Sequence, residues 1–300
     1  MTTINIGIVA HVDAGKTSLT ERILYETHVI DEIGRVDKGT TQTDSLDLEK
    51  RRGITIKASV VSFFVNTLKI NLIDTPGHAD FLAEVERSFS VLDGAILLIS
   101  AVEGIQTQTK ILLLALRKLH IPTIIFINKI DRSGAQADEL IKRVKEKLTE
   151  HIIPLYRTEH IGAKHASVAQ NHLRDPTFLQ ACIEQLALND ERLLAAYVEE
   201  EATTERRVRT ALTRQVREAK LSPVFFGSAI TGAGVRELLA ELGSHFPSTT
   251  SLEDAPQNAH ATLLSERKKI DFRMPSLFLS DHLPFARGET RSFPCTLFRH

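Results

Sequence analysis

Short apolar runs bounded by turn residues recur along most of the chain, and this pattern is typical of buried strands. Between most of these runs, apolar residues return at helical spacing, which predicts helices at residues 16–25, 79–92, 106–119, 137–150 and 235–242. Six strands are predicted, at residues 4–10, 58–65, 68–73, 94–100, 123–127 and 223–226. Because strands and helices alternate, the pattern predicts an α/β fold with a doubly wound, mostly parallel, six-stranded sheet.

The alternation stops between about residues 150 and 221. From 176 to 218 the sequence is predominantly helical, with Leu193, Leu194, Ala196 and Val198 among charged neighbours. Strand-like sequence resumes afterwards, so we expect a mainly helical insertion into the main domain.

The character changes again after Pro247. Residues 248–300 show no sustained hydrophobic period, and their prolines and phenylalanines follow no clear face. The sequence therefore predicts a main domain at 1–247 and a tail of unassigned structure at 248–300.

Composition narrows the class of protein. The 37 basic and 38 acidic residues give a formal net charge of -1, so no global basic field points to a DNA partner. Cys182 and Cys295 have no metal-ligand spacing, which fits a reducing compartment, the cytoplasm. No apolar run is long enough to span a membrane, and no periodicity indicates a coiled coil, so we expect a monomer without a membrane anchor.

A loop that reads AHVDAGKT, at residues 10–17, joins the first predicted strand to the first predicted helix. In a phosphate-binding loop (P-loop), backbone N–H groups and a helix N-terminus converge on phosphate oxygens, a lysine reaches the outer phosphates, and a hydroxyl ligates Mg²⁺. Lys16 and Thr17 suit the last two roles, and Gly15 allows close backbone approach. The alternative is an ordinary turn with a chance Gly-Lys-Thr. The predicted nucleotide-binding residues here are Asp13, Ala14, Gly15, Lys16, Thr17 and Ser18.

A second motif, Asp-Thr-Pro-Gly-His at 74–78, ends another predicted strand. Asp74 is predicted to hold Mg²⁺, and the N–H of Gly77 to sense a γ-phosphate. The alternative is plain β-turn chemistry.

A third motif, Asn-Lys-Ile-Asp at 128–131, supplies base specificity. The Asp131 carboxylate can accept the ring N–H and the exocyclic amine of guanine, whereas adenine would leave it unpaired, which discriminates by ~10⁴-fold. Asn128 is predicted to brace the loop, and the Lys129 stem to lie against the base. Backbone N–H groups of a short segment would meet the guanine carbonyl; its residues are Ser228, Ala229 and Ile230. Ordered on successive strand ends, the motifs predict a P-loop GTPase domain that binds GTP or GDP.

These motifs, together with Arg-Gly-Ile-Thr-Ile at 52–56, resemble those of the translational GTPases, similar to elongation factor G and most similar to the ribosomal protection proteins of tetracycline resistance. The likeness spans about residues 3–247. It implies that Thr55 ligates Mg²⁺ and touches the γ-phosphate, that Asp13 helps to coordinate a monovalent cation, and that His78 orients the attacking water. The alternative for His78 is a helix cap.

The resemblance implies a ribosome-stimulated GTPase whose partner is the ribosome. Two alternatives stay open: a translocation factor of the elongation factor G type, and a nucleotide-binding remnant without resistance activity. Residues 205–209 could face ribosomal components or form a solvated surface. Residues 251–300 do not resemble the β-barrel expected next, which suggests a truncated or frameshifted start of the next domain. Reading the other two frames of the gene tests this, since barrel-like sequence should appear there.

Overall fold

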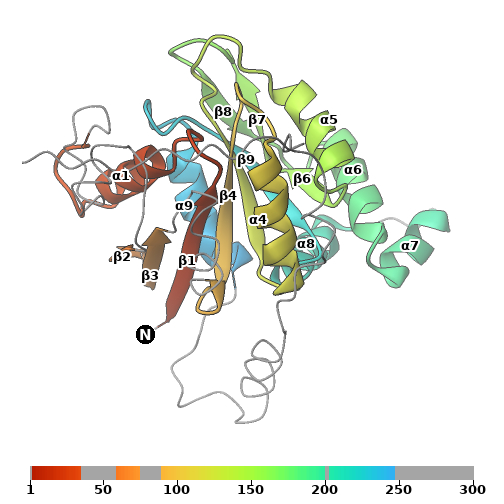
Figure 1. Cartoon of the computed structure of the whole chain (residues 1–300). Helices are drawn as coiled ribbons and strands as arrows, with labels where there is room; N and C mark the ends of the chain where they lie inside the picture. Colours follow the sequence, from red (N-terminus) through yellow and green to blue (C-terminus); the bar gives the residue numbers. More distant parts are fainter. Residues whose placement is uncertain (1, 35–58, 75–88, 200–202, 247–300) are drawn as a thin grey trace, which may run out of the picture. The chain divides into compact units, whose positions relative to one another are not determined.

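Among the residues that the structure describes, seven strands form one sheet in the order β2-β3-β1-β4-β5-β9-β6 (Figure 1). The computed structural model describes residues 2–34, 59–74, 89–199 and 203–246. The strands are β1 (Thr3–Ala10), β2 (Ser59–Val65), β3 (Leu68–Asp74), β4 (Gly94–Ser100), β5 (Thr123–Asn128), β6 (Ile152–Pro154) and β9 (Ser222–Phe226).

All pairings in this sheet are parallel except that of the edge strand β2 with β3. Every residue of β4 and β5 is buried, because helices cover both faces of a parallel sheet, and this explains their unbroken apolar runs. In β2 the pattern alternates instead: Phe63 is buried, whereas Val60 and Phe64 are exposed.

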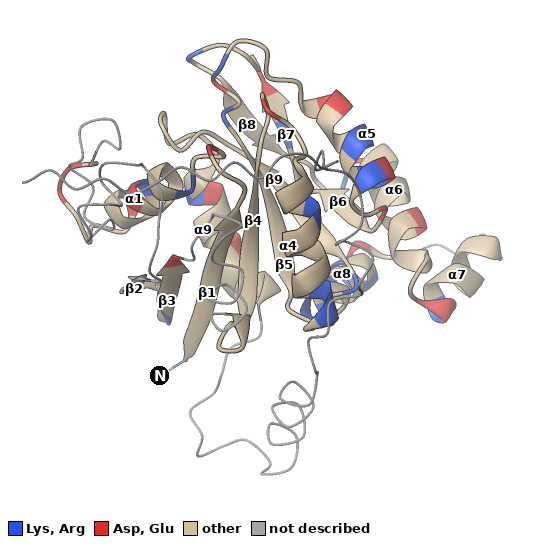
Figure 2. Ribbon diagram, in the orientation of Figure 1, with Lys and Arg blue, Asp and Glu red and all other residues tan. Residues whose placement is uncertain are grey.

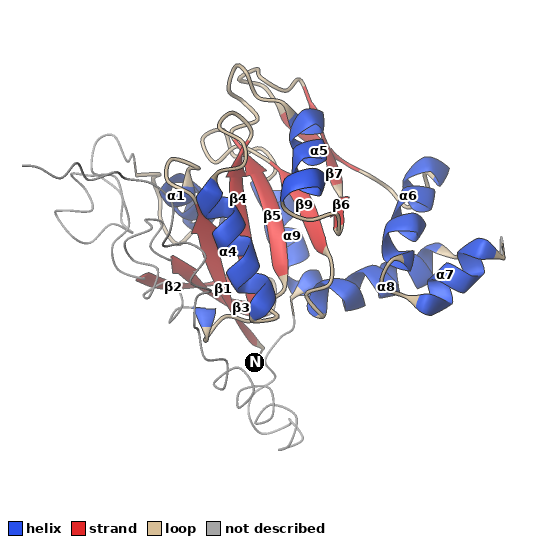
Figure 3. Cartoon of the chain, turned by 45° about the vertical axis from the view of Figure 1, so that its right-hand side comes forward, coloured by secondary structure: helices blue, strands red, loops and turns tan. Residues whose placement is uncertain are grey.

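Helices cover the two faces of the sheet. Figure 3 shows α4 (Thr107–Lys118) and α5 (Ala137–Lys147) in front of the strands, with α9 (Val235–His245) behind them. The helix that follows the phosphate-binding loop, α1 (Lys16–Glu26), packs against α9. Their buried stripes recur at helical spacing, as in Leu112, Leu113 and Leu116 of α4. No helix within the described ranges is both long and apolar enough to span a lipid bilayer.

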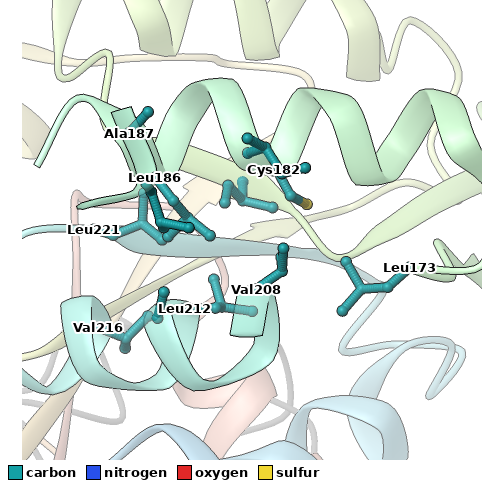
Figure 4. Packing of buried hydrophobic residues seen from close by; sticks show 12 residues of the cluster. Leu173, Cys182, Leu186, Ala187, Val208, Leu212, Val216 and Leu221 are labelled. Carbon is teal, nitrogen blue, oxygen red and sulfur yellow. The ribbon is translucent and has the colours of Figure 1, made fainter. Parts of the chain in front are cut away.

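The insertion has an apolar cluster of its own (Figure 4). Its helices are α6 (Pro176–Ala187), α7 (Glu191–Val198) and α8 (Glu205–Arg217), and it also contains an antiparallel hairpin of β7 (Tyr156–Glu159) and β8 (Ser167–Gln170). Asp175, Asp190 and Thr204 cap the three helices by accepting hydrogen bonds from backbone N–H groups. The cluster consists of Ile153, Leu173, Cys182, Ile183, Leu186, Ala187, Leu193, Val208, Ala211, Leu212, Val216 and Leu221.

The predicted doubly wound α/β class, with a mainly helical insertion, is confirmed. Within the described ranges the sheet has seven strands where six were predicted, because β6 was not recognised, and the β7–β8 hairpin was also missed. These strands are three or four residues long, too short for a hydrophobic period to show. Most of the helix predicted at 79–92 and the whole tail lie outside the described residues.

Candidate functional site

The predicted motifs meet at one edge of the sheet, where parallel strands have their carboxyl ends. β1 leads into the phosphate-binding loop, β3 ends at Asp74, β5 ends at Asn128, and Ser228 follows β9. β3 and β4 pair with opposite sides of β1, so the chain connections diverge at that strand. Open α/β sheets bind their ligands at such a switch point.

The phosphate-binding loop holds two left-handed backbone conformations, at Asp13 (φ 65°) and Gly15 (φ 95°). Gly15 directly precedes α1, so the first N–H groups of that helix open onto the loop. A Cβ atom on Gly15 would lie only 2.5 Å from the Nδ2 atom of Asn128. Glycine is therefore required here both for its φ angle and for lack of space.

Two opposite charges are buried beside this loop. The Lys16 Nζ atom forms an ion pair with Asp74 Oδ1, and both side chains are almost wholly excluded from solvent. Thr17, the next residue of α1, is also buried. A Mg²⁺–nucleotide complex needs three kinds of group: a cation for the phosphates, and a carboxylate and a hydroxyl for the metal ion. Lys16, Asp74 and Thr17 place these groups at one edge of the sheet.

Asn128 joins the phosphate-binding loop to the segment after β9. Its Nδ2 group donates to the Ala14 carbonyl at 2.9 Å, and its Oδ1 atom accepts from the Ala229 N–H at 2.9 Å. The side chain is 2% exposed, so both bonds lie in a low-dielectric interior. The predicted bracing contact is thus present, and it extends to a second loop.

Asp131 offers a buried hydrogen-bond acceptor. No partner for its Oδ1 atom is found in the part of the chain that the structure describes. A buried carboxylate oxygen without a donor is costly, so the position fits a ligand that brings N–H groups, as guanine does.

Lys129 lies beside it with φ 67°, and its Nζ atom pairs with Glu103 Oε1 at 2.8 Å. Partial burial acts to raise the pKa of the Glu103 carboxyl, but hydrogen bonds from Lys129 and from its own backbone amide outweigh this and lower it. Glu103 was not predicted from the sequence. It fixes the direction of the Lys129 stem, which the motif alone does not determine.

The last motif lies beside α1. Ser228 is buried, and its Oγ atom accepts from the Thr231 N–H at 3.1 Å, whereas the Ile230 side chain is 61% exposed. Arg22 of α1 donates through Nε to the Ala229 carbonyl at 3.0 Å and through Nη2 to the Ile230 carbonyl. Arg22 was missed in the sequence, where no local signal links it to a segment more than 200 residues away.

His11, which the sequence analysis left out of the site, is buried in the same loop. Its Nδ1 atom lies 3.1 Å from Thr109 Oγ1 of α4, and burial lowers the pKa of its ring. A neutral imidazole that links the loop to α4 is a structural role.

The structure thus brings together the loop residues 13–18, Asp74, Asn128, Lys129, Asp131 and 228–230. Thr55, Gly77 and His78 lie outside the described residues. The contacts of each of these side chains with nucleotide stay predictions.

Comparisons with known proteins identify the family of the chain. The elongation factor Tu GTP binding domain family matches residues 1–248. The chain is 48% identical to the oxytetracycline resistance protein of Streptomyces rimosus over 86% of its length, and 47% identical to the tetracycline resistance protein TetP of Clostridium perfringens over 81%. Tetracycline resistance protein TetM of Streptomyces lividans is 48% identical over 83%.

The chain spans less than two fifths of the length of these relatives, namely 39%, 37% and 38%. Among solved structures, a crystal structure of a Thermus thermophilus protein superposes with a TM-score of 0.73 at 27% identity. The superposition covers 82% of this chain and 40% of that one. The chain therefore belongs to the elongation factor Tu GTP binding domain family.

Proposed function

We propose that this GTPase domain acts on the ribosome, where GTP hydrolysis serves to remove tetracycline. One observation carries the proposal: the chain is 47% to 48% identical to three tetracycline resistance proteins, over more than four fifths of its length. A ribosomal site of action also implies a cytoplasmic protein. Because the chain spans less than two fifths of those relatives, resistance is a proposal about the whole protein.

Base recognition follows from the buried polar groups. Asp131 presents a carboxylate oxygen that has no donor among the described residues, and the two N–H groups of guanine would satisfy it. Adenine would leave the oxygen unpaired, so we expect a preference for guanine of ~10⁴-fold. Asn128 keeps the base-binding and phosphate-binding loops in register. The Lys129 stem, held by Glu103, would lie against the plane of the base.

Phosphate binding uses the first turn of α1 and the loop before it. The Lys16 ammonium would exchange the Asp74 carboxylate for the outer phosphates of GTP. Asp74, Thr17 and Thr55 are the residues that would hold Mg²⁺. When bound, that ion neutralises the charge that develops on the phosphate oxygens during hydrolysis.

Hydrolysis itself is assigned to His78. Its imidazole would orient a water molecule whose oxygen attacks the γ-phosphorus, and the bond to the β-phosphate oxygen breaks to give GDP and inorganic phosphate. The Gly77 N–H would bind the γ-phosphate, and Asp13 would help to hold a monovalent cation. These roles come from the resemblance of the motif.

We also propose that residues 1–247 form the GTPase domain, with the insertion at about 150–221, and that residues 248–300 do not belong to it. The family match, which ends at residue 248, supports this division. A fragment of residues 1–247 should therefore bind GDP with the affinity of the full chain, measured by titration calorimetry.

The test of function measures GTP turnover with and without ribosomes, together with the tetracycline tolerance of cells that produce the chain. Ribosome-stimulated turnover with tolerance supports the proposal. GTP binding with neither would identify a nucleotide-binding remnant, and stimulated turnover without tolerance would favour a translocation-type factor.

Two variants keep this test interpretable. Lys16→Ala should abolish nucleotide binding, and unchanged GTP affinity would contradict the phosphate-loop assignment. His78→Ala should keep GTP binding and lose ribosome-stimulated turnover. Thermal unfolding of both variants shows whether the fold survives, because Lys16→Ala removes the cation that pairs with the buried Asp74 carboxylate.

A further inference from the structure

One face of α8 consists of arginine and threonine alone. At 100° per residue, the seven residues on this arc of the helix share one side. Neither Glu205, the first residue of the helix, nor Glu218, the residue after it, falls within the arc. The members of this arginine face are Arg206, Arg207, Arg209, Thr210, Thr213, Arg214 and Arg217.

The opposite side of α8 fixes this face outward. Val208, Leu212 and Val216 are buried in the cluster of the insertion, as Figure 4 shows. Gln215 is also buried, and its Nε2 group donates to the Leu186 carbonyl at 2.8 Å. The helix therefore cannot rotate without exposing apolar surface and breaking a buried hydrogen bond, so the five arginine side chains stay at the surface.

Most of this charge lacks a carboxylate partner within the described part of the chain. Arg214 pairs with Asp190, the cap of α7, but no ion pair is found there for Arg206, Arg207, Arg209 or Arg217. Two of these side chains have carbonyl contacts: Arg207 donates to Arg192 and Arg217 to Ser244. Arg209 is close enough to Glu241 of α9 to lower the pKa of that carboxyl, although burial raises it overall.

The excess is local. Helix α8 carries five arginines and one glutamate, in a chain with a formal net charge of -1. Figure 2 shows Lys and Arg gathered at α8, whereas acidic and basic residues are interspersed along α5. A hollow of about 330 Å³ between α7 and α8 adds Arg192 to this surface and is lined also by Thr204 and Thr210. Asp190 is the acidic residue in its lining.

We propose that the arginine face of α8 binds the phosphate backbone of RNA. Guanidinium groups match phosphate oxygens with paired N–H donors, and interleaved threonine hydroxyls add further donors. Every large apolar side chain of α8 is buried, so the face lacks the apolar centre that a protein interface has. The contact would depend on backbone charge rather than on base sequence.

This inference rests on the proposed action on the ribosome, because ribosomal RNA is the phosphate-rich surface that such a protein meets. It adds a contact with the ribosome that is carried by the insertion. This contact is separate from the nucleotide edge, the edge of the sheet where the phosphate-binding and base-binding motifs meet. Binding through α8 would contribute to ribosome affinity without changing intrinsic GTP binding.

The first measurement uses the full chain and protein-free large-subunit ribosomal RNA, titrated at several salt concentrations. Arg206→Gln, Arg209→Gln and Arg217→Gln are combined in one variant that leaves the Arg214–Asp190 pair intact. The matched control combines Lys142→Gln, Arg143→Gln and Lys145→Gln on α5, which removes the same charge from another exposed helix. We expect the α8 variant to lose about tenfold in RNA affinity, and the slope of log K against log salt to fall by about 2 to 3.

Equal RNA affinity of the wild type and the α8 variant, or an equal loss in the α5 control, would overturn the inference. Loss of binding to intact ribosomes with unchanged binding to free RNA would also overturn it, in favour of an acidic ribosomal protein. A wild-type chain that binds RNA through α8 but shows no ribosome-stimulated turnover would refute the proposed function alone. Unchanged GDP affinity and thermal unfolding of both variants confirm that the fold is intact.

Discussion

The nucleotide edge and the helical insertion are each stabilised by a different kind of interaction. At the edge, buried polar groups connect segments far apart in the sequence: Asn128 joins two loops, and Lys16 pairs with Asp74. In the insertion, a cluster of apolar side chains lies inside, and the charges lie outside. A surface that must receive a polar ligand keeps directional groups in its interior, whereas a region that presents an outer face needs only a packed core.

Asp131→Asn should have the largest effect, and it should be confined to the edge. An amide in place of the carboxylate loses its acceptor pair for the two guanine N–H groups, so GTP affinity should fall by ~10³- to 10⁴-fold. The asparagine amide can donate to the carbonyl that xanthine carries in place of the exocyclic amine, so xanthosine triphosphate should bind better than GTP. Competition titrations with both nucleotides measure this.

Asp138→Asn on α5 is the matched control, since it removes an exposed carboxylate outside the motif. Its preference for GTP should equal that of the wild type. Asp131→Asn should unfold at the wild-type temperature when no nucleotide is present. A variant that retains the GTP preference would show that the buried oxygen of Asp131 does not recognise the base.

Leu186→Ala should do the reverse, with a loss of stability and little loss of binding. Leu186 is fully buried in the cluster of the insertion (Figure 4), so truncation leaves a cavity and should cost about 2 to 5 kcal/mol of unfolding free energy. Urea unfolding measures this, and GDP affinity should change less than twofold. The control is Leu188→Ala at the end of the same helix, whose side chain is 59% exposed. Parallel losses of stability and GDP affinity would erase the proposed difference between the two regions.

His245 lies on α9, which packs against α8, and it is a buried polar side chain outside the nucleotide edge. The pH dependence of stability measures its contribution. Its ring is buried, both of its nitrogens lack hydrogen-bond partners among the described residues, and it packs edge-on against Phe225. Burial, together with the charge of Arg217, lowers the pKa of the imidazole to about 4. The Glu241 carboxylate lies 3.5 Å from Nε2 of His245. Burial nevertheless lowers the pKa of His245 and raises the pKa of Glu241, so for both groups burial outweighs their mutual attraction.

The unfolded imidazole takes up a proton near pH 6.5, whereas the folded one resists until about pH 4. Stability from this group is therefore complete above pH 6.5 and is lost as the pH falls towards 4, by about 3 kcal/mol. Urea unfolding at pH 7, 6 and 5 should show this slope in the wild type and a shallower one in His245→Leu. His172→Leu, an exposed control, should keep the wild-type slope. Identical slopes in all three proteins would exclude His245 as the cause.

The contrast also explains what could be predicted from the sequence. Strands β4 and β5 are central and buried on both faces, so their continuous apolar runs revealed them, and the motifs at strand ends located the edge. The three residues of β6 pair through their backbone with β9, and the half-buried residues of β8 have no alternation to detect. Helix α8 lies within the stretch 176–218 that was predicted to be predominantly helical, but its packing is needed to show that the arginine face points outward.

At the nucleotide edge, some contacts depend on residues that the fold brings together and that the sequence motifs do not contain. Asn128 was predicted as a brace because its motif carries that role, but its bond to the Ala229 N–H needs both loops in place. Arg22 carried no such signal, since the carbonyls that it contacts lie at the other end of the domain's sequence. Such a residue can be found only when the fold brings its partners together.

Arg22→Met should give the smallest effect, and it asks how far the polar scaffold of the edge extends. Arg22 holds the Ala229 and Ile230 carbonyls from α1, and a hydrogen bond from a charged donor is worth about 1.5 kcal/mol at the lower end of its range. We expect GDP to dissociate about tenfold faster in stopped-flow experiments with a fluorescent analogue, because the base-binding segment loses its support. Arg22→Lys should recover part of the loss, since an ammonium can replace one bond.

The decisive comparison for that last variant is Arg236→Met. Arg236 pairs with Glu26 at 2.6 Å, and Glu26 also faces Arg22 at 3.6 Å, so both arginines share one carboxylate. Of these two arginines, Arg22 is the one that donates to the Ala229 and Ile230 carbonyls. If the two variants release GDP equally fast, the shared ion pair rather than the carbonyl contacts supports the site. If only Arg22→Met accelerates release, the scaffold of the nucleotide edge reaches from Asn128 through the last motif to the outer side of α1.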